Sequence, residues 1–94
     1  MSAAFRLLPS SGYKRNVRKL VKRNRALLDL VKGLQKALED DPHNRGQAHD
    51  IGKLTDVKTG EGQYRIRSGN YRIRYDIIGT DVILYSFSDR KNAY

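Results

Sequence analysis

The sequence contains no cysteine and no tryptophan, and it has two prolines among its 94 residues. Without cysteine there is no disulfide framework, no thiolate nucleophile and no thiolate-bound zinc. No apolar run approaches the roughly 18 residues that a membrane-spanning helix needs, and the first residues do not have the pattern of a signal peptide. We therefore expect a single domain over residues 1–94 that works in the cytoplasm without contacting a membrane.

Positive charge is what the chain has in excess. Lysine and arginine together number 19 against 10 acidic residues, which gives a formal net charge of +9. The hydrophobic fraction of 38% is sufficient for a modest core and too high for a plainly disordered chain. Such a charge favours an anionic partner, with nucleic acid first and a membrane surface second.

The first forty residues predict a strand followed by helix. Residues 3–8 have the pattern of a short strand that Pro9 ends. From Tyr13 to about Glu39 the apolar residues recur at helical spacing, interrupted by the polar segment 22–24. Because one long helix would have little to pack against, we expect a helical hairpin.

The last third changes to the alternation of strands. Residues 64–68 and 71–77 alternate apolar and charged side chains, and Gly69-Asn70 between them is typical of a two-residue hairpin turn. Residues 82–87 are apolar on both faces, which predicts an interior strand. The polar segment 43–62 before them predicts a loop.

The fold class expected from this order is α+β. An N-terminal strand and a helical hairpin precede an antiparallel sheet of about four strands in total, with the helices on one face. One further short strand is expected inside the polar segment, around residues 53–55.

The predicted hairpin gathers four arginines on one face of the sheet. A two-residue turn at residues 69–70 places Arg67 opposite Arg72 and Arg65 opposite Arg74. Like charges directly opposite one another destabilise a sheet, and arginine does not lose its proton in proteins. Something anionic must therefore offset this cluster.

Two sources of that negative charge stay open. In the first interpretation, Asp76, Glu61 and Asp89 neutralise a solvated surface. In the second, the arginines bind phosphate, whose oxygens accept two parallel hydrogen bonds from one guanidinium.

The first helical segment adds more cations before any acidic residue appears. It is either a solvated helix face or a second contact to a polyanion too long for one site. In the second case, the expected nucleic-acid-binding residues are Arg74 of the sheet together with Lys14, Arg15, Arg18, Lys19 and Lys22.

Three blocks of residues, together with the order of elements, resemble the RelE/ParE toxin superfamily. The blocks are Gln63-Tyr64-Arg65-Ile66-Arg67, Gly69-Asn70-Tyr71-Arg72-Ile73-Arg74-Tyr75 and Ser88-Asp89-Arg90-Lys91-Asn92-Ala93-Tyr94. The resemblance implies a RelE-like fold, related to that of microbial ribonucleases. It also implies the toxin of a type II toxin–antitoxin system, an endoribonuclease that cuts mRNA in the ribosomal A site by attack of the 2′-hydroxyl, with no metal or cofactor. A cognate antitoxin that forms a hetero-oligomer with the toxin is the implied protein partner, beside mRNA and the ribosome.

Site residues follow from the same resemblance. It implies that Arg72 clamps the scissile phosphate and that Arg90 stabilises the developing charge near the leaving 5′-oxygen. Tyr94 would stack on or orient the nucleotide, while Arg65 and Arg67 would position the 2′-hydroxyl.

The general base is left unassigned by these residues. RelE itself has lysines at the positions of Arg65 and Arg67, and a lysine can lose a proton where arginine cannot. Tyr94 is one titratable candidate and His49, in the loop, is another.

Two other functions stay open beside the mRNA interferase. A ParE-like protein would share the fold and inhibit DNA gyrase without cutting RNA. A simple RNA-binding module would need only the arginines.

Overall fold

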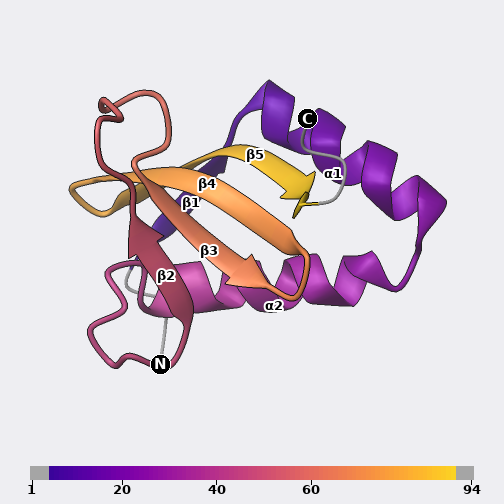
Figure 1. Ribbon diagram of the computed structural model, residues 1–94, viewed down its shortest axis with the longest axis horizontal. Helices are drawn as coiled ribbons and strands as arrows, with labels where there is room; N and C mark the ends of the chain where they lie inside the picture. Colours follow the sequence, from indigo (N-terminus) through magenta and orange to yellow (C-terminus); the bar gives the residue numbers. More distant parts are fainter. Residues whose placement is uncertain (1–4, 91–94) are drawn as a thin grey trace.

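The computed structural model describes residues 5–90, and the outermost residues at both ends lie outside this description (Figure 1). The described elements, in chain order, are β1 (Arg6–Pro9), α1 (Ser11–Arg23), α2 (Leu27–Asp40), β2 (Asp50–Lys53), β3 (Tyr64–Ser68), β4 (Tyr71–Ile78) and β5 (Asp81–Asp89). They form an α+β domain, which confirms the predicted fold class.

The sheet has five strands in the order β1-β5-β4-β3-β2, one more than the predicted number of about four. The edge strand β1 runs parallel to β5, and the other neighbours are antiparallel. The additional strand is β2, which begins three residues before the segment 53–55 where the sequence placed a strand. β5 lies between β1 and β4, so the predicted interior strand is confirmed.

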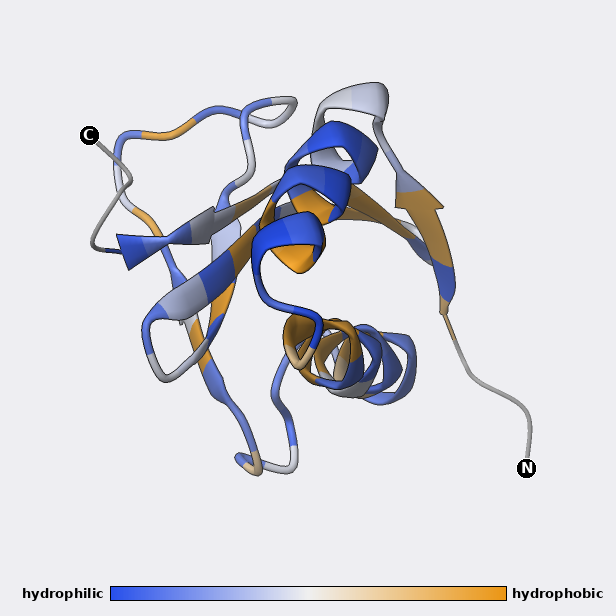
Figure 2. Cartoon of the chain, turned by 90° about the vertical axis from the view of Figure 1, so that its right-hand side faces the viewer, coloured by the Kyte–Doolittle hydropathy of each residue, from blue (hydrophilic) through white to orange (hydrophobic). Residues whose placement is uncertain are grey.

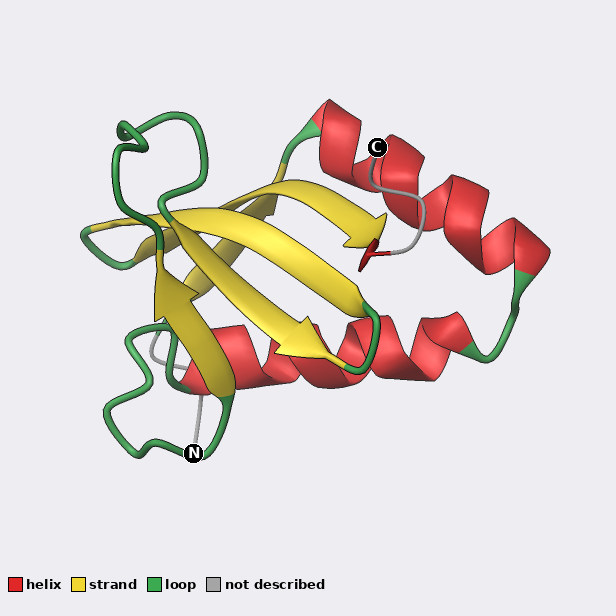
Figure 3. Ribbon diagram, in the orientation of Figure 1, coloured by secondary structure: helices red, strands yellow, loops and turns green. Residues whose placement is uncertain are grey.

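The two helices form the predicted hairpin (Figure 3). Ser10 caps α1, because its side-chain oxygen accepts a hydrogen bond from the backbone N–H of Tyr13 at 3.1 Å. Asn24 ends that helix, and three residues later Leu27 begins α2. α1 packs along β5, and α2 contacts β1 and β3. No helix within the described part of the chain is long and apolar enough to cross a membrane.

The core lies between the helices and one face of the sheet. Figure 2 shows the apolar sides of the helices turned inward. The buried cluster consists of Tyr13, Val31, Leu34, Ala37, Leu38, Ile66, Ile73, Tyr75, Val82, Leu84 and Phe87. The hydroxyl of Tyr75 donates to the carbonyl of Pro42 at 2.8 Å, so this buried polar group has a partner.

The β3–β4 hairpin has the register that the sequence predicts. Gly69 begins the turn with a φ of 60°, which favours glycine. Ile66 lies opposite Ile73, and both are buried on the helix side. A bulge interrupts the pairing of β4 with β5, because Arg74 lies opposite Ser86 while the next residue, Tyr75, lies opposite Leu84.

The core assignment predicts different costs for two isoleucines of one strand. Ile73→Ala should lower the free energy of unfolding by about 2–5 kcal/mol, because Ile73 is 0% exposed and its truncation leaves a cavity. Ile78→Ala is the matched control, because Ile78 is 49% exposed; its cost should stay below about 1 kcal/mol. Urea unfolding measures both values, and equal costs would contradict the assignment.

Candidate nucleic-acid interface

Arg65, Arg67, Arg72 and Arg74 lie on the face of the sheet opposite to the helices, and we call these four residues the arginine face. They lie there because they alternate along β3 and β4 with residues that pack toward the core. The register pairs Arg65 with Arg74 and Arg67 with Arg72. The predicted cross-strand pairs of like charge are therefore present.

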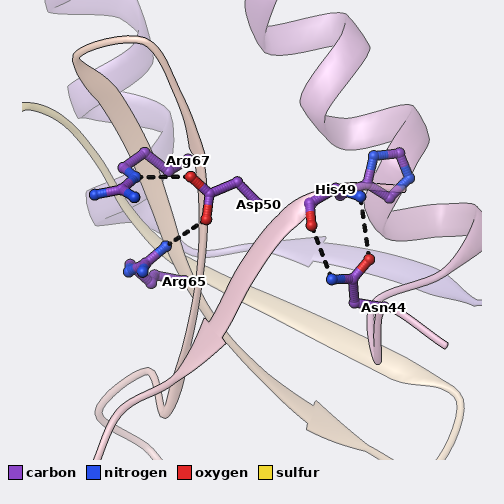
Figure 4. Close-up of polar contacts among 5 residues, drawn as sticks. All are labelled: Asn44, His49, Asp50, Arg65 and Arg67. Atoms are coloured by element: carbon purple, nitrogen blue, oxygen red, sulfur yellow. Dashed lines mark hydrogen bonds and ion pairs between the residues drawn. The ribbon is translucent and has the colours of Figure 1, made fainter. Parts of the chain in front are cut away.

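Asp50 of β2 bridges the two arginines of β3 (Figure 4). Its Oδ2 accepts from Nε of Arg67 at 2.9 Å, and its Oδ1 accepts from Nη1 of Arg65 at 3.4 Å. These contacts, with that to Arg67 the stronger, outweigh desolvation and lower the pKa of Asp50, so the carboxylate is ionised at neutral pH. Its side chain is 51% exposed and stays open to solvent. Sequence reasoning did not identify this residue.

Gly52, two residues after Asp50 on β2, leaves room for the guanidinium of Arg65. A Cβ atom at this position would lie 3.3 Å from Nη2 of Arg65. The guanidinium therefore lies across the backbone of β2, next to the carboxylate of Asp50.

Hydrogen bonds from side chains to backbone groups hold the loop before β2 in place. The Asn44 amide donates to the carbonyl of His49 at 2.8 Å and accepts from the His49 N–H at 3.1 Å. The Asp41 carboxylate accepts from the N–H groups of Arg45 and Gly46. These bonds fix the start of β2, and with it Asp50.

His49 does not join the arginines. Figure 4 shows its imidazole pointing away from Arg65 and Arg67, on the other side of the strand from the Asp50 carboxylate. The alternation of adjacent side chains along an extended chain explains this arrangement.

Arg74 is held by a loop rather than by a carboxylate. Its Nε and Nη2 both donate to the carbonyl of Gly62, at 3.2 and 2.9 Å. Gly62 has a φ of 84°, and a Cβ there would lie 3.1 Å from Cβ of Arg74. This close crossing requires glycine.

Asp76 of β4 holds the same loop through hydrogen bonds to its backbone. It is 1% exposed and accepts from the N–H groups of Gly60 at 2.5 Å and Gln63 at 2.7 Å. Burial acts to raise the pKa of Asp76, but the hydrogen bonds from Gln63, Gly60 and Tyr85 together hold it below its usual value. A buried, ionised carboxylate therefore holds the loop onto the sheet.

These contacts correct one interpretation of the sequence. In one of the two interpretations Asp76, Glu61 and Asp89 neutralise the arginines, yet Asp76 bonds to loop backbone and Glu61 accepts from the N–H of Lys58 at 3.0 Å. Asp50, which was not in that interpretation, is the carboxylate that pairs with Arg65 and Arg67. Neither the length of the intervening loops nor their polar composition revealed this pairing.

Arg72 and Arg90 lie at the same end of the sheet. Arg72 is opposite Ser88, and the backbone N–H of Arg90 donates to the carbonyl of Asn70 in the hairpin turn at 2.6 Å. Nε of Arg72 is buried and has no hydrogen-bond partner among the described residues. Tyr94 lies outside the described part of the chain.

The cations of α1 do not lie on the arginine face, because α1 packs on the core side of the sheet. Lys14, Arg15, Arg18, Lys19 and Lys22 are all exposed. Lys19 borders a cavity beside the end of β5, whereas Arg18 and Lys22 border a groove toward α2. Within residues 5–90, no three histidine, aspartate or glutamate side chains are arranged to hold a metal ion.

Comparison with known proteins shows similarity at the level of fold. No family model matches the sequence, and no curated protein matches it either. A chain of the RelBE2 toxin–antitoxin complex from Mycobacterium tuberculosis superposes with a TM-score of 0.68 at 21% identity, covering 96% of this chain and 100% of that one. A chain of the RelB–RelE antitoxin–toxin complex from Methanococcus jannaschii gives 0.63 at 22% identity, covering 93% and 94%.

The contacts of Asp76 predict an acid-sensitive loop. Because its pKa is lowered in the folded protein, the stabilisation is complete above the unfolded value of about 3.9 and disappears as the pH falls below it. Asp76→Asn should lower the free energy of unfolding at pH 7 by about 1–3 kcal/mol, because an amide cannot accept both hydrogen bonds as a carboxylate does.

The same variant should also flatten the dependence of stability on pH between about 5 and 3. Asp56→Asn is the control, because Asp56 is exposed. Unfolding in urea at several pH values measures both variants. Parallel pH curves for the parent protein and Asp76→Asn would contradict the role of this carboxylate.

Proposed function

We propose that this protein is the toxin of a toxin–antitoxin pair and cleaves mRNA on the ribosome. The observation that carries the proposal is the arginine face, where four guanidiniums gather and one carboxylate, that of Asp50, pairs with two of them. The fold shared with chains of two toxin–antitoxin complexes supports it. So does the sequence resemblance to RelE-like toxins, which covers the hairpin and the residues around Arg90.

The chemistry of arginine fits a phosphate diester. A guanidinium binds two phosphate oxygens at once and stays charged, so it also stabilises the extra negative charge of a pentacoordinate transition state. Arg72 has a buried Nε with no partner in the described chain, so no protein acceptor holds its guanidinium through this atom. We therefore assign the scissile phosphate to Arg72, with Arg90 beside it at the turn end of the sheet.

The proposed reaction is an internal displacement at phosphorus. The 2′-oxygen of the substrate forms a new bond to phosphorus while the bond to the 5′-oxygen breaks. The products are a 2′,3′-cyclic phosphate and a new 5′-hydroxyl, whose proton comes from water. The arginines supply the positive charge that this step needs.

Asp50 is the proposed acceptor of the proton from the 2′-hydroxyl. Its carboxylate contacts Arg65 and Arg67, the residues that the resemblance assigns to that hydroxyl. It is ionised at neutral pH and half exposed, so it carries no proton and is open to substrate, while the arginines that lower its pKa also weaken it as a base. This assignment replaces His49, whose ring points away from the arginines.

The protein partner in this proposal is an antitoxin that covers the basic surface. Charge complementarity favours an acidic segment in that partner, since the chain carries a net charge of +9.

The first test is primer extension on cellular mRNA after expression of the chain. We expect cuts inside translated codons, and we expect Arg72→Ala/Arg90→Ala to abolish them because the scissile phosphate loses its ligands. Arg45→Ala, in the exposed loop before β2, is the control and should cut like the parent protein, because alanine keeps the backbone N–H that bonds to Asp41.

Other outcomes of this experiment discriminate between the proposed function and its rivals. Growth arrest and a DNA-damage response without new mRNA ends would refute RNA cleavage in favour of gyrase inhibition. RNA binding without either effect would indicate that the protein is an RNA-binding module.

The second test concerns Asp50. Asp50→Asn should slow cleavage about 100-fold or more, because the amide cannot take up the proton. RNA affinity should stay equal or rise, since a negative charge next to the bound phosphate is removed. The parent rate should persist down to about pH 4, because the pKa of Asp50 lies below its ordinary value. Unchanged cleavage by Asp50→Asn would show that the carboxylate is a counter-ion only.

A further inference from the structure

A cavity of about 230 Å³ lies between α1 and the end of β5. It forms because β1 pairs only with Asp81–Leu84, so on this edge the rest of β5 runs beside the helix, while its other edge stays paired with β4. Asn16 of α1 fastens the two walls together, since its Oδ1 accepts from the N–H of Phe87 at 3.2 Å. The cavity is therefore part of the folded framework.

The helix wall of this cavity is basic and its floor is apolar. Lys19 and Arg23 lie one turn apart on α1, and both side chains border the cavity. Leu20 provides an apolar part of the lining, and Phe87 lies buried beneath it at 1% exposure. Phe87 is held in place by stacking on Tyr71, with ring centroids 5.7 Å apart.

The strand wall connects the cavity to the arginine face. Ser88 borders the cavity and lies directly opposite Arg72 in the sheet register. The backbone of Arg90 is hydrogen-bonded to the turn at this same end. An extended polyanion bound at Arg72 therefore needs only to pass around the end of β5 to reach Lys19 and Arg23.

We propose that this cavity binds one nucleotide of single-stranded RNA, with its phosphate on Lys19 and Arg23 and its base against Leu20 and the strand wall. The proposal rests on the proposed function, because it extends the same RNA chain beyond the phosphate at Arg72. The volume lies below the roughly 300–1,000 Å³ of sites that hold an entire small ligand, which fits one unit of a longer chain. Asp89 also borders the cavity, so the phosphate belongs on the helix side, away from this carboxylate.

The proposal divides the cations of α1 between two surfaces. Arg18 and Lys22 border a separate groove toward α2, whose lining includes the apolar Val17, Val21 and Leu28. That groove lies on another side of the helix and has no residue in common with the cavity. Among the cations of α1, we therefore assign the contact with the nucleotide's phosphate to Lys19 and Arg23.

The test measures binding of a short single-stranded RNA that carries 2′-O-methyl groups, so that it binds without being cut. Lys19→Ala/Arg23→Ala should weaken binding roughly tenfold or more, and it should lower the salt dependence of log affinity by roughly 0.7, because one phosphate is no longer neutralised. Lys32→Ala/Lys36→Ala is the matched control, because it removes two exposed cations one turn apart on α2. Its affinity should stay within about twofold of the parent value.

Three results would count against the proposal. Equal losses in the cavity pair and the α2 pair would show a diffuse charge effect and overturn the nucleotide site. An equal loss in Arg18→Ala/Lys22→Ala would do the same, because that pair removes the same charges from the other side of α1. No RNA binding by the parent protein would overturn the nucleotide site, whereas the proposed function stands or falls by the mRNA cuts in the primer-extension test.

Discussion

Two cross-strand pairs of arginines are the constraint around which the exposed face of the sheet is arranged. The buried isoleucines of β3 and β4 fix the register, and that register places Arg65 opposite Arg74 and Arg67 opposite Arg72. A slip by one residue would relieve the repulsion but would turn every core side chain of the hairpin toward solvent. The fold keeps the register and supplies acceptors to the arginines instead.

Two loops deliver those acceptors from opposite ends of the sheet. The loop before β2 brings the carboxylate of Asp50 to the two arginines of β3. The loop before β3, held by the buried Asp76, brings the carbonyl of Gly62 to Arg74. Arg72 receives neither, and its Nε is left without a partner in the described chain. This unequal supply of acceptors within residues 5–90 is the reason that the proposed function assigns the phosphate to Arg72.

The sequence was sufficient for the parts of the fold that depend on local periodicity. Helical spacing gave the hairpin of helices, and alternation around Gly69-Asn70 gave the β3–β4 register residue by residue. β2 has only one large apolar residue, Ile51, so periodicity could not define it. Asp50 was missed for the same reason, because its partners depend on how β2 pairs with β3. The loop contacts of Gly62 and Asp76 join residues whose approach no local pattern encodes.

The central claim is that the arginine face, and Arg72 above all, takes an RNA phosphate. The most direct measurement is an NMR titration that follows the Nε–Hε signals of the arginines while uncleavable single-stranded RNA is added. The account predicts the largest shift at Arg72, smaller shifts at Arg65 and Arg67 as they exchange contacts with Asp50, and little change at Arg74, which stays on the Gly62 carbonyl. Shifts confined to the arginines of the helices, with the signal of Arg72 unmoved, would contradict it.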